Sequence, residues 1–200
     1  MFLCAFLTSV SANAKDGVYA GADVLWSNAK HKYLNRIAAD TRDGQSVDDS
    51  SIGGSVDLGY KMSFGEAFLA PEIFYDYLNS SSKGFHYVDG ANNRQDSLEL
   101  KDRYGAKLNV GYNIFSKLSG FVSVGVANTD YNNRRPSIGS SYGSSKLAPI
   151  YGVGFSYGLT ENIALRTSYD YQQFNVGYVS EGVRDRVTLG VLRLGAVYTF

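Results

Sequence analysis

Charged side chains recur at alternate positions within apolar stretches of this sequence, and their chemistry needs an explanation. The stretch "VLRLGAVYTF", residues 191–200, carries a guanidinium in its middle. Alternate residues of a β-strand share one face, so the charges of successive strands are expected to meet. Burial of matched opposite charges is tolerable, whereas an unpaired charge is strongly penalised. The set comprises five acids and five bases: Asp23, Asp57, Glu72, Asp76 and Asp170, with Lys61, Arg103, Lys107, Arg166 and Arg193.

A hydrolytic site is the second chemistry to consider, because the two histidines each follow a serine by four residues. Ser27 precedes His31, and Ser82 precedes His86. A nucleophile needs a base and an orienting acid. Neither pair has an acid partner or a strained elbow, so a lipid-modifying hydrolase is the less favoured alternative, and we expect a protein that is not an enzyme.

Metal and cofactor chemistry finds little support in the sequence. Asp40, Asp43, Asp48 and Asp49 fall in one polar stretch, and calcium prefers such oxygen clusters. Their spacing differs from the EF-hand pattern, which favours a hydrated loop. No Walker, Rossmann or zinc spacing occurs, so no cofactor or metal is expected.

The elements that must position these residues are strands, because the dominant periodicity from Gly17 onward is two. In "DRYGAKLNVGY" one alternate set is wholly apolar and the other is charged or small. Eight such segments are predicted, at residues 17–27, 51–62, 67–78, 98–112, 118–128, 147–158, 163–173 and 186–200.

The connections between these segments alternate between short and long. Residues 63–66, 113–117 and 159–162 are tight, whereas residues 28–50, 79–97, 129–146 and 175–185 are long and polar. Each predicted strand has about the ten residues that a tilted strand needs to cross the hydrocarbon. The pattern predicts an all-β fold, an eight-stranded antiparallel up-and-down transmembrane β-barrel with short periplasmic turns and long extracellular loops.

The polar set is expected inside this barrel and the apolar set outside. A soluble ligand-binding barrel would have the reverse arrangement, but the polar set is rich in Gly, Ser and Ala and too small for an outer surface. The interior of an eight-stranded barrel is only just wide enough for side chains. We therefore expect a salt-bridged, closed lumen centred on Glu72, Arg103, Lys107 and Arg166, with a narrow porin as the alternative. Pro71 lacks a ladder donor and predicts a bulge or bend.

Aromatic residues at the strand ends predict two girdles at the membrane boundaries. The periplasmic girdle comprises Tyr60, Tyr112, Tyr157, Tyr198 and Phe200. The outer girdle comprises Trp26, Tyr75, Tyr77, Tyr104, Tyr151, Tyr169 and Tyr171.

Residues 1–14 read as a signal peptide, with Ala12 and Ala14 forming the small-residue cleavage motif, and residues 15–200 as the barrel domain. Cys4, the single cysteine, falls in this leader. The 19 basic and 19 acidic side chains cancel, so nucleic acid is not expected as a partner.

The polar connections suggest two kinds of partner. "GFHYVDGANNRQD" and "DYNNRRPSIGSSYGSS" are rich in Tyr, Ser, Gly and Asn, as recognition surfaces are, and a host or surface ligand and a merely solvated loop are equally open. Basic residues suited to lipopolysaccharide phosphates are Lys30, Lys32, Arg36, Arg134 and Arg135; solvated charge is an equally simple interpretation.

On these features the chain resembles the small outer-membrane barrel family that includes opacity-type surface proteins and the membrane domain of outer membrane protein A. The resemblance is carried by the leader, by "GVYAGADVLW", "GYKMSFGEAFLAPEIFYDY" and "LRTSYDY", and by the ending "LRLGAVYTF". It implies the outer membrane of a Gram-negative bacterium, periplasmic termini, and a role as surface antigen, adhesin or envelope stabiliser, although members are often labelled porins. It also implies insertion by the barrel assembly machinery, with Phe200 as the assembly signal.

Overall fold

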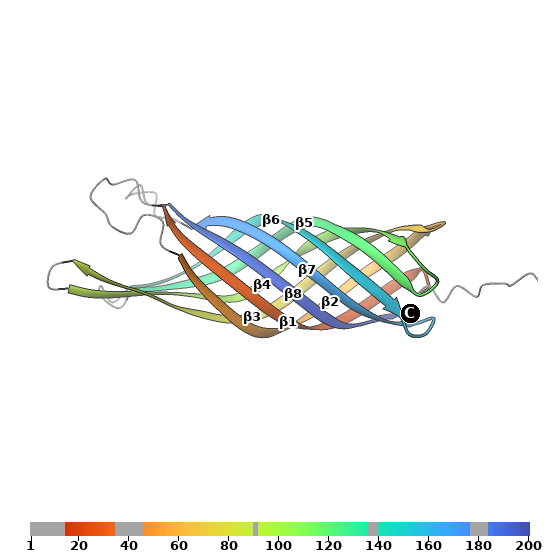
Figure 1. The fold of residues 1–200 in the computed structure, drawn as a ribbon, viewed down its shortest axis with the longest axis horizontal. Helices are drawn as coiled ribbons and strands as arrows, with labels where there is room; N and C mark the ends of the chain where they lie inside the picture. Colours follow the sequence, from red (N-terminus) through yellow and green to blue (C-terminus); the bar gives the residue numbers. More distant parts are fainter. Residues whose placement is uncertain (1–14, 35–45, 90–91, 136–139, 177–183) are drawn as a thin grey trace, which may run out of the picture.

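The chain forms one closed barrel of eight antiparallel strands in a computed structural model that describes residues 15–34, 46–89, 92–135, 140–176 and 184–200 (Figure 1). The strands are β1 (Gly17–Leu34), β2 (Ser46–Phe64), β3 (Ala67–Asp89), β4 (Asn92–Asn113), β5 (Leu118–Arg135), β6 (Ser140–Gly158), β7 (Ile163–Val176) and β8 (Arg184–Thr199). No helix in the described part of the chain is long and apolar enough to cross a bilayer.

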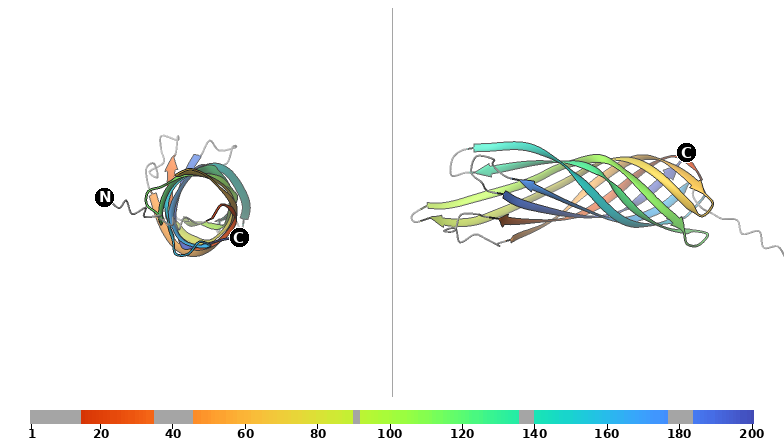
Figure 2. Two further views of the ribbon diagram at one scale, coloured as in Figure 1. Left: turned by 90° about the vertical axis from the view of Figure 1, so that its right-hand side faces the viewer. Right: turned by 90° about the horizontal axis from the view of Figure 1, so that it is seen from above.

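Each strand pairs with its neighbours in the sequence, and β8 pairs with β1 to close the ring, which Figure 2 shows end-on. Trp26, for example, stands opposite Ile52 of β2 on one side and Leu192 of β8 on the other. Closure gives each strand a neighbour on both sides, so the ring has no free edge strand. The predicted all-β, up-and-down eight-stranded barrel is therefore confirmed.

One end of the barrel carries the short turns. Residues 65–66, 114–117 and 159–162 connect the strands there, close to the predicted positions. Gly65 has a φ of 66°, a conformation that glycine adopts without steric cost. Lys15 N donates to Glu161 O (3.2 Å) and Phe200 N to Val18 O (3.0 Å), so both ends of the barrel segment lie at this short-turn end.

At the opposite, long-strand end the prediction of strand length was wrong. β1 continues to Leu34 instead of residue 27, and β3 continues to Asp89 instead of residue 78. Much of the sequence predicted as long loops therefore belongs to strands. The β3–β4 hairpin projects beyond its neighbours at this end (Figure 1). The apolar outer pattern stops near Trp26, but interstrand hydrogen bonding does not depend on lipid and continues.

The bulge predicted at Pro71 was also misplaced. The β2–β3 register is the same on both sides of Pro71, although Tyr60 and Pro71 do not form a ladder pair. Because proline has no N–H, the ladder is interrupted there without a shift. The β3–β4 register shifts instead between Tyr77 and Ser80, where Asn79 has a φ of 46°. Asparagine tolerates this left-handed conformation better than most residues.

Candidate functional site

The predicted charge set lies inside the barrel, and nine of its ten members are buried, from 0% exposed for Asp76, Arg103 and Arg193 to 7% for Arg166. They come from six of the eight strands and meet in the middle of the lumen. The nine form one connected network of ion pairs, with five carboxylates and four cations: Asp23, Asp57, Glu72, Asp76, Arg103, Lys107, Arg166, Asp170 and Arg193.

Arg166 of β7 is the branching point of one half of this network. Its guanidinium donates to Glu72 Oε2 at 2.9 Å and to Asp23 Oδ2 at 2.8 Å, and it also bonds to Asp57. Three carboxylates from β1, β2 and β3 thus share one cation. A planar guanidinium has enough fixed donors for several acceptors, which suits it to this position better than an ammonium group.

The other half of the network is built around Asp76 and Asp170. Arg193 donates to Asp170 Oδ2 (2.9 Å) and to Asp76 Oδ2 (2.8 Å), and Arg103 Nε donates to Asp76 Oδ2 (2.7 Å). Lys107 joins the two halves, with its Nζ 3.2 Å from Glu72 Oε1 and 3.6 Å from Asp170 Oδ2. The charge in the middle of the last strand is therefore neutralised by β3 and β7.

Neutral donors stabilise the excess of carboxylates. Glu72 accepts a hydrogen bond from Tyr19 Oη at 2.8 Å and another from Asn109 Nδ2 at 3.1 Å. Asp76 accepts one from Ser55 Oγ at 2.7 Å. Hydrogen bonds to a charged acceptor are stronger than neutral ones. These three uncharged residues of the inner face therefore belong to the same site, although the sequence analysis, which collected charges, missed them.

Phe74 lies among the cations of the network. The centres of the Arg193 and Arg103 guanidinium groups and Lys107 Nζ lie 4.8, 5.5 and 5.4 Å from its ring centroid. A cation over an aromatic face gains about 0.5–2 kcal/mol. Lys61, the tenth predicted member, is half-buried nearer the short-turn end, with its Nζ 5.0 Å from the Phe68 centroid.

Small residues opposite the charges make room for them. A Cβ on Gly21 would lie 2.6 Å from the Asp57 carboxylate, and a Cβ on Gly195 would lie 2.6 Å from Asp23 Cα. Both contacts are too close for a side chain. Gly21 and Gly195 therefore leave space that their ladder neighbours Asp57 and Asp23 occupy.

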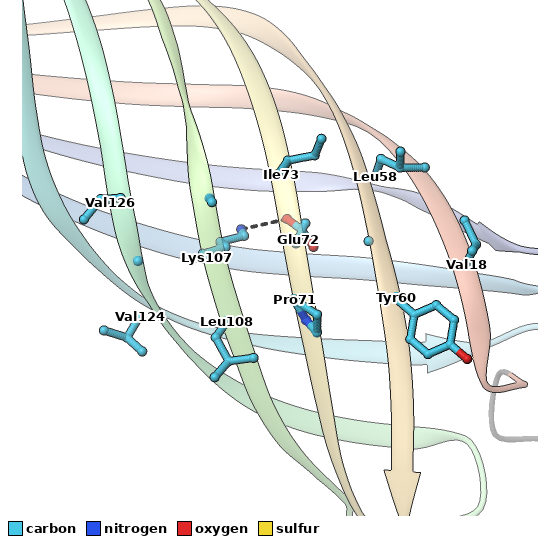
Figure 3. A pocket seen from close by; sticks show the side chains of 13 residues that line it. Val18, Leu58, Tyr60, Pro71, Glu72, Ile73, Lys107, Leu108, Val124 and Val126 are labelled. Atoms are coloured by element: carbon cyan, nitrogen blue, oxygen red, sulfur yellow. Dashed lines mark ion pairs between the residues drawn. The ribbon is translucent and has the colours of Figure 1, made fainter.

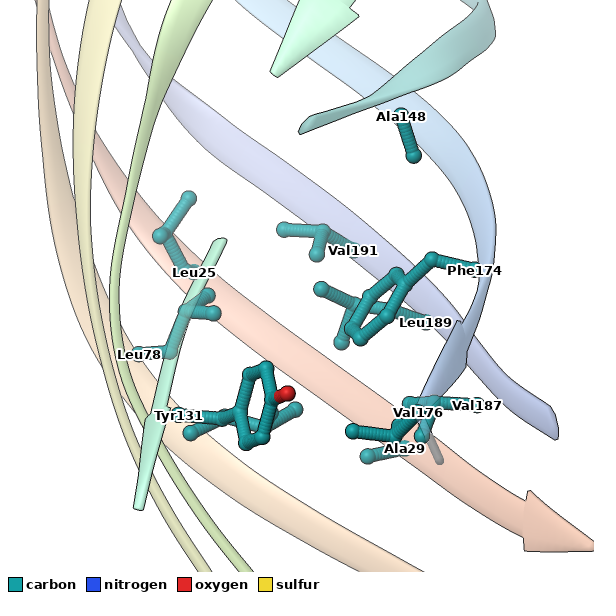
Figure 4. Packing of buried hydrophobic residues seen from close by; sticks show 11 residues of the cluster. Leu25, Ala29, Leu78, Tyr131, Ala148, Phe174, Val176, Val187, Leu189 and Val191 are labelled. Carbon is teal, nitrogen blue, oxygen red and sulfur yellow. The ribbon is translucent and has the colours of Figure 1, made fainter. Parts of the chain in front are cut away.

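Toward the long-strand end the interior is apolar instead of charged (Figure 4). Leu78, Val187, Leu189 and Val191 are fully buried, and Phe174 is 6% exposed. We call this set the apolar cluster: Leu25, Ala29, Leu78, Leu100, Tyr131, Ala148, Phe174, Val176, Val187, Leu189 and Val191. On β1, β3, β4, β7 and β8 its residues lie on the long-strand side of the charged ones, and Tyr131 of β5 and Ala148 of β6 complete this next layer of the interior.

Toward the same long-strand end, the outer face of the barrel changes from apolar to polar. The band from Val24 to Trp26 on β1 is apolar outside, whereas Asn28, Lys30 and Lys32 beyond it are exposed and polar. On β7 and β8, exposed Gln173, Asn175 and Arg186 likewise replace aromatic and leucine side chains. The barrel is thus apolar outside in its middle and apolar inside at the long-strand end. The sequence signal was available, because Val187, Leu189 and Val191 alternate on the face of Arg193.

On the short-turn side of the charges, the interior holds a second, smaller apolar group of Tyr19, Phe68 and Ala70, with Phe121 and Val197 against it. A cavity of about 70 Å³ lies there, lined by Lys61, Phe68, Glu72 and Arg166 among others. Its volume admits a few water molecules at most.

The predicted girdle residues all point outward. Trp26 is 60% exposed, and the tyrosines of both groups range from 38% for Tyr171 to 57% for Tyr112. The terminal Phe200 packs edge-on against Tyr198, with ring centroids 5.2 Å apart. Their arrangement as two planes at lipid boundaries, and the role of Phe200 in assembly, stay predictions.

The outer wall is not uniformly convex. A groove of about 680 Å³ runs over β1 to β5, where Ile73, Leu108 and Val124 point outward around Pro71 (Figure 3). The Lys107–Glu72 ion pair belongs to the inward positions next to it.

The serine and histidine residues are not arranged as a catalytic pair on β1. Ser27 is buried and its Oγ lies 2.7 Å from Ser51 Oγ. His31 is four residues further along the same strand, which places the two Cα atoms roughly 13 Å apart. Ser82 and His86 lie in β3, within the segment whose side chains are not described.

Two of the four aspartates considered for calcium, Asp48 and Asp49, lie in β2 and contact different partners. Asp48 lies 3.9 Å from Lys30, and Asp49 accepts a hydrogen bond from Ser80 Oγ at 2.7 Å. Within the described residues no group of three metal-ligating side chains converges. Asp40, Asp43, Arg36 and residues 1–14, with Ala12 and Ala14, lie outside the described residues, as do the side chains of Arg134 and Arg135.

Comparison with known proteins agrees with this architecture. A family model described as outer membrane protein beta-barrel domain matches residues 1–200. Outer membrane protein A of Klebsiella aerogenes is 26% identical over 199 residues, which cover 99% of this chain and 53% of that protein. The chain therefore spans about half the length of the curated relatives it matches.

Two solved structures have the same fold at low sequence identity. Outer membrane protein OprG from Pseudomonas aeruginosa superposes with a TM-score of 0.59 at 15% identity, covering 94% of this chain and 98% of that one. Ail, the attachment invasion locus protein of Yersinia pestis, gives a TM-score of 0.53 at 15% identity, covering 92% and 99%.

Proposed function

The chain belongs to the outer membrane protein β-barrel domain family and is an integral protein of the Gram-negative outer membrane, and from this we propose that it acts at the cell surface as a closed barrel, structural or adhesive, rather than as a pore. In this proposal the short turns and both termini face the periplasm, and the long-strand end faces outward. This orientation follows the general pattern of outer-membrane barrels.

The filled interior is the observation that carries the proposal. The nine-residue charge network occupies the middle of the lumen, and the apolar cluster, with six side chains at 2% exposure or less, occupies the layer above it. An ion crossing this interior would have to displace ion pairs and then pass a dry layer. Two consecutive barriers of different chemistry support a closed resting state better than the salt bridges alone.

The long-strand end supports a role in surface contact. Its outer face is polar and its interior is apolar, as in a small water-soluble barrel, whereas the middle of the barrel is apolar outside. The β3–β4 hairpin extends furthest, through Asp89 and Asn92. A hydrogen-bonded strand pair loses less conformational freedom on binding than an irregular loop would, which favours adhesion. Ail, which has this fold, was crystallised with a heparin analogue.

A non-enzymatic role is part of the proposal. On β1 the one described Ser–His pair is too far apart for proton transfer, and its serine is engaged with Ser51. We expect lipid A from cells with and without the protein to give identical mass spectra.

A narrow porin is the second candidate, favoured by the cavity of about 70 Å³ that reaches Glu72 and Arg166 from the short-turn side. Planar-bilayer recording of the purified, refolded barrel separates the two. We expect no stable conductance steps from the wild type. Steps that change in size or ion selectivity in Glu72→Gln would overturn the closed barrel and support the porin.

Adhesion is tested with cells that display either the full barrel or a barrel whose β3–β4 hairpin is shortened. Binding to immobilised heparin and to cultured epithelial cells should fall in the shortened form at equal surface levels. Equal binding of both forms, with no conductance, would leave a purely structural barrel and would contradict the adhesive part of the proposal.

A further inference from the structure

The ring of strands opens between β6 and β7 toward the long-strand end. The two strands form ladder pairs only as far as Ile150 and Gln172. Beyond that pair, residues 140–149 of β6 stay paired to β5, and residues 173–176 of β7 stay paired to β8. In Figure 2 the β5–β6 pair reaches beyond the end of β7. Within the described part of the chain, one edge of β6 therefore has no partner strand.

A second opening, between β2 and β3, is bridged by side chains. Ser51 Oγ donates to Leu78 O at 2.7 Å, and Ser80 Oγ donates to Asp49 at 2.7 Å, beyond the last ladder pair of these strands. Between the described side chains of residues 143–149 and those of residues 173–176 there is no such bridge. The opening beside β6 is thus the less protected of the two.

The inner face of β6 next to this opening is uncovered. Ala148 points inward and is 6% exposed, whereas Lys146 and Ser144, at the next inward positions, are exposed. Their ladder partners on β5, Thr129 and Tyr131, are nevertheless buried. The exposure therefore changes at the edge of β6 and not across the whole layer of the interior.

The surroundings of this edge are chemically distinct on its two sides. Phe174 and Val176 of β7, across the opening, belong to the apolar cluster. On β6, residues 143–145 are glycine and serines, so no bulky side chain obstructs an approaching backbone. Lys146 follows them, and no acid pairs with it among the described side chains. The opening thus combines unpaired backbone groups, an apolar wall and one cation.

We propose that the open edge of β6, residues 143–148, binds an extended segment of another protein by β-strand addition. The unpaired N–H and C=O groups of a strand edge bond to an extended backbone, and alternate side chains of the added strand fall on opposite faces. The segment directs apolar residues toward Phe174 and Val176 and places an acid at Lys146. Charge complementarity favours a foreign segment over a second copy of this chain, because residues 140–149 contain a lysine and no acid. The inference rests on the adhesive part of the proposed function and adds to it an edge and a class of partner.

The test uses fluorescent peptides of about ten residues, in which valine alternates with threonine and one valine is replaced by glutamate. They are titrated against the barrel refolded in detergent micelles, with empty micelles as background, and binding is followed by fluorescence anisotropy. Two matched peptides carry N-methyl groups on one or the other alternate set of backbone amides. We expect saturable binding that falls at least tenfold with one methylated set only, since one edge of the added strand faces β6. Equal binding of all three peptides, or an equal loss with both methylated sets, would overturn the proposal.

Amide hydrogen exchange locates the bound peptide on the barrel. Saturating peptide should slow exchange at residues 143–148 and leave the β3–β4 hairpin unchanged. Slow exchange without peptide at every barrel concentration would show that this chain covers its own edge, and slowing with barrel concentration would show a second copy; either result would overturn the proposal. Hairpin-dependent adhesion without protection at β6 would overturn this inference alone. Peptide binding by a barrel that does not adhere would support the strand edge and contradict the adhesive role.

The charge at the edge is tested by Lys146→Glu, with Lys117→Glu in the β4–β5 turn as the matched control. Lys146→Glu should weaken binding of the glutamate peptide by about two- to fivefold, the size of an exposed ion pair, and the control should not. A peptide with lysine in place of its glutamate should bind Lys146→Glu better than it binds the wild type. A loss that this exchange does not reverse would overturn the placement of an acid at Lys146. Heat-modified gel mobility verifies that each variant is folded.

Discussion

Arg166→Met is the substitution that most directly probes the closed interior. Arg166 is 7% exposed and donates hydrogen bonds to Asp23, Asp57 and Glu72. Methionine fills a similar volume without charge, so the change removes the cation and leaves packing largely intact. Lys107 still reaches Glu72 at 3.2 Å, and Arg193 lies 3.9 Å from Asp23. Asp57 has no other cation among the network contacts, so it bears most of the loss.

The expected loss in the free energy of unfolding follows from the burial of the Asp57 carboxylate, since Asp57 is 6% exposed. Removing one partner of a buried ion pair costs about 3–5 kcal/mol, because the other charge is left without compensation. Adding Asp57→Asn removes the stranded charge while keeping its size. The double variant should therefore recover at least about 1 kcal/mol of the loss, giving a coupling energy in the range measured for contacting residues, roughly 0.5–3 kcal/mol.

The assay is equilibrium unfolding in urea of the barrel refolded into lipid vesicles, followed by Trp26 fluorescence. Lys117→Met, an exposed cation in the β4–β5 turn, is the control and should change the free energy of unfolding by less than about 0.5 kcal/mol. A loss below about 1 kcal/mol in Arg166→Met, or no recovery on adding Asp57→Asn, would refute the closed network and imply that water solvates Asp57.

Three further predictions use the same unfolding measurement. Tyr19→Phe removes the 2.8 Å hydrogen bond to Glu72 and should cost about 1.5–3 kcal/mol; a negligible change would mean that water replaces the hydroxyl. Leu78→Ala in the apolar cluster should cost about 2–5 kcal/mol, clearly more than Leu58→Ala on the outer face. Equal losses in the two variants would show that the cluster is not a packed core. Gly21→Ala places a Cβ 2.6 Å from the Asp57 carboxylate and should cost about 1–3 kcal/mol. Gly54→Ala, whose Cβ would have its nearest neighbour 3.9 Å away, should be tolerated. A larger loss in Gly54→Ala than in Gly21→Ala would contradict the packing described for Gly21.

The alternation of side chains determined much of this protein from sequence. Because successive residues of a strand face opposite sides, Arg193 and Asp170 could be assigned to the interior and Leu192 and Tyr171 to the exterior without coordinates. Strand length and the alternation of short and long connections then predicted the closed eight-stranded barrel, which the structure confirms.

The same rule explains where the prediction failed. Strand ends were placed where the apolar outer pattern ends, since that pattern reports contact with lipid. Beyond Trp26 the outward positions of β1 become polar, and β1 and β3 continue because the ladder needs only a neighbouring strand. The apolar cluster was therefore missed, although Leu189 and Val187 lie on the face that Arg193 had already identified as inward.

Partner choice inside the lumen was decided by tertiary structure alone. Periodicity gives the face of a side chain but neither its height in a tilted barrel nor its neighbours across the lumen. Arg193 meets Asp76, 117 residues away, and Lys61 falls outside the central contacts because it is four residues nearer the turn than Asp57. The sequence by itself thus determined which residues are inside. Closure of β8 onto β1 decided which of them meet, because only the closed ring fixes the shear that sets their relative heights.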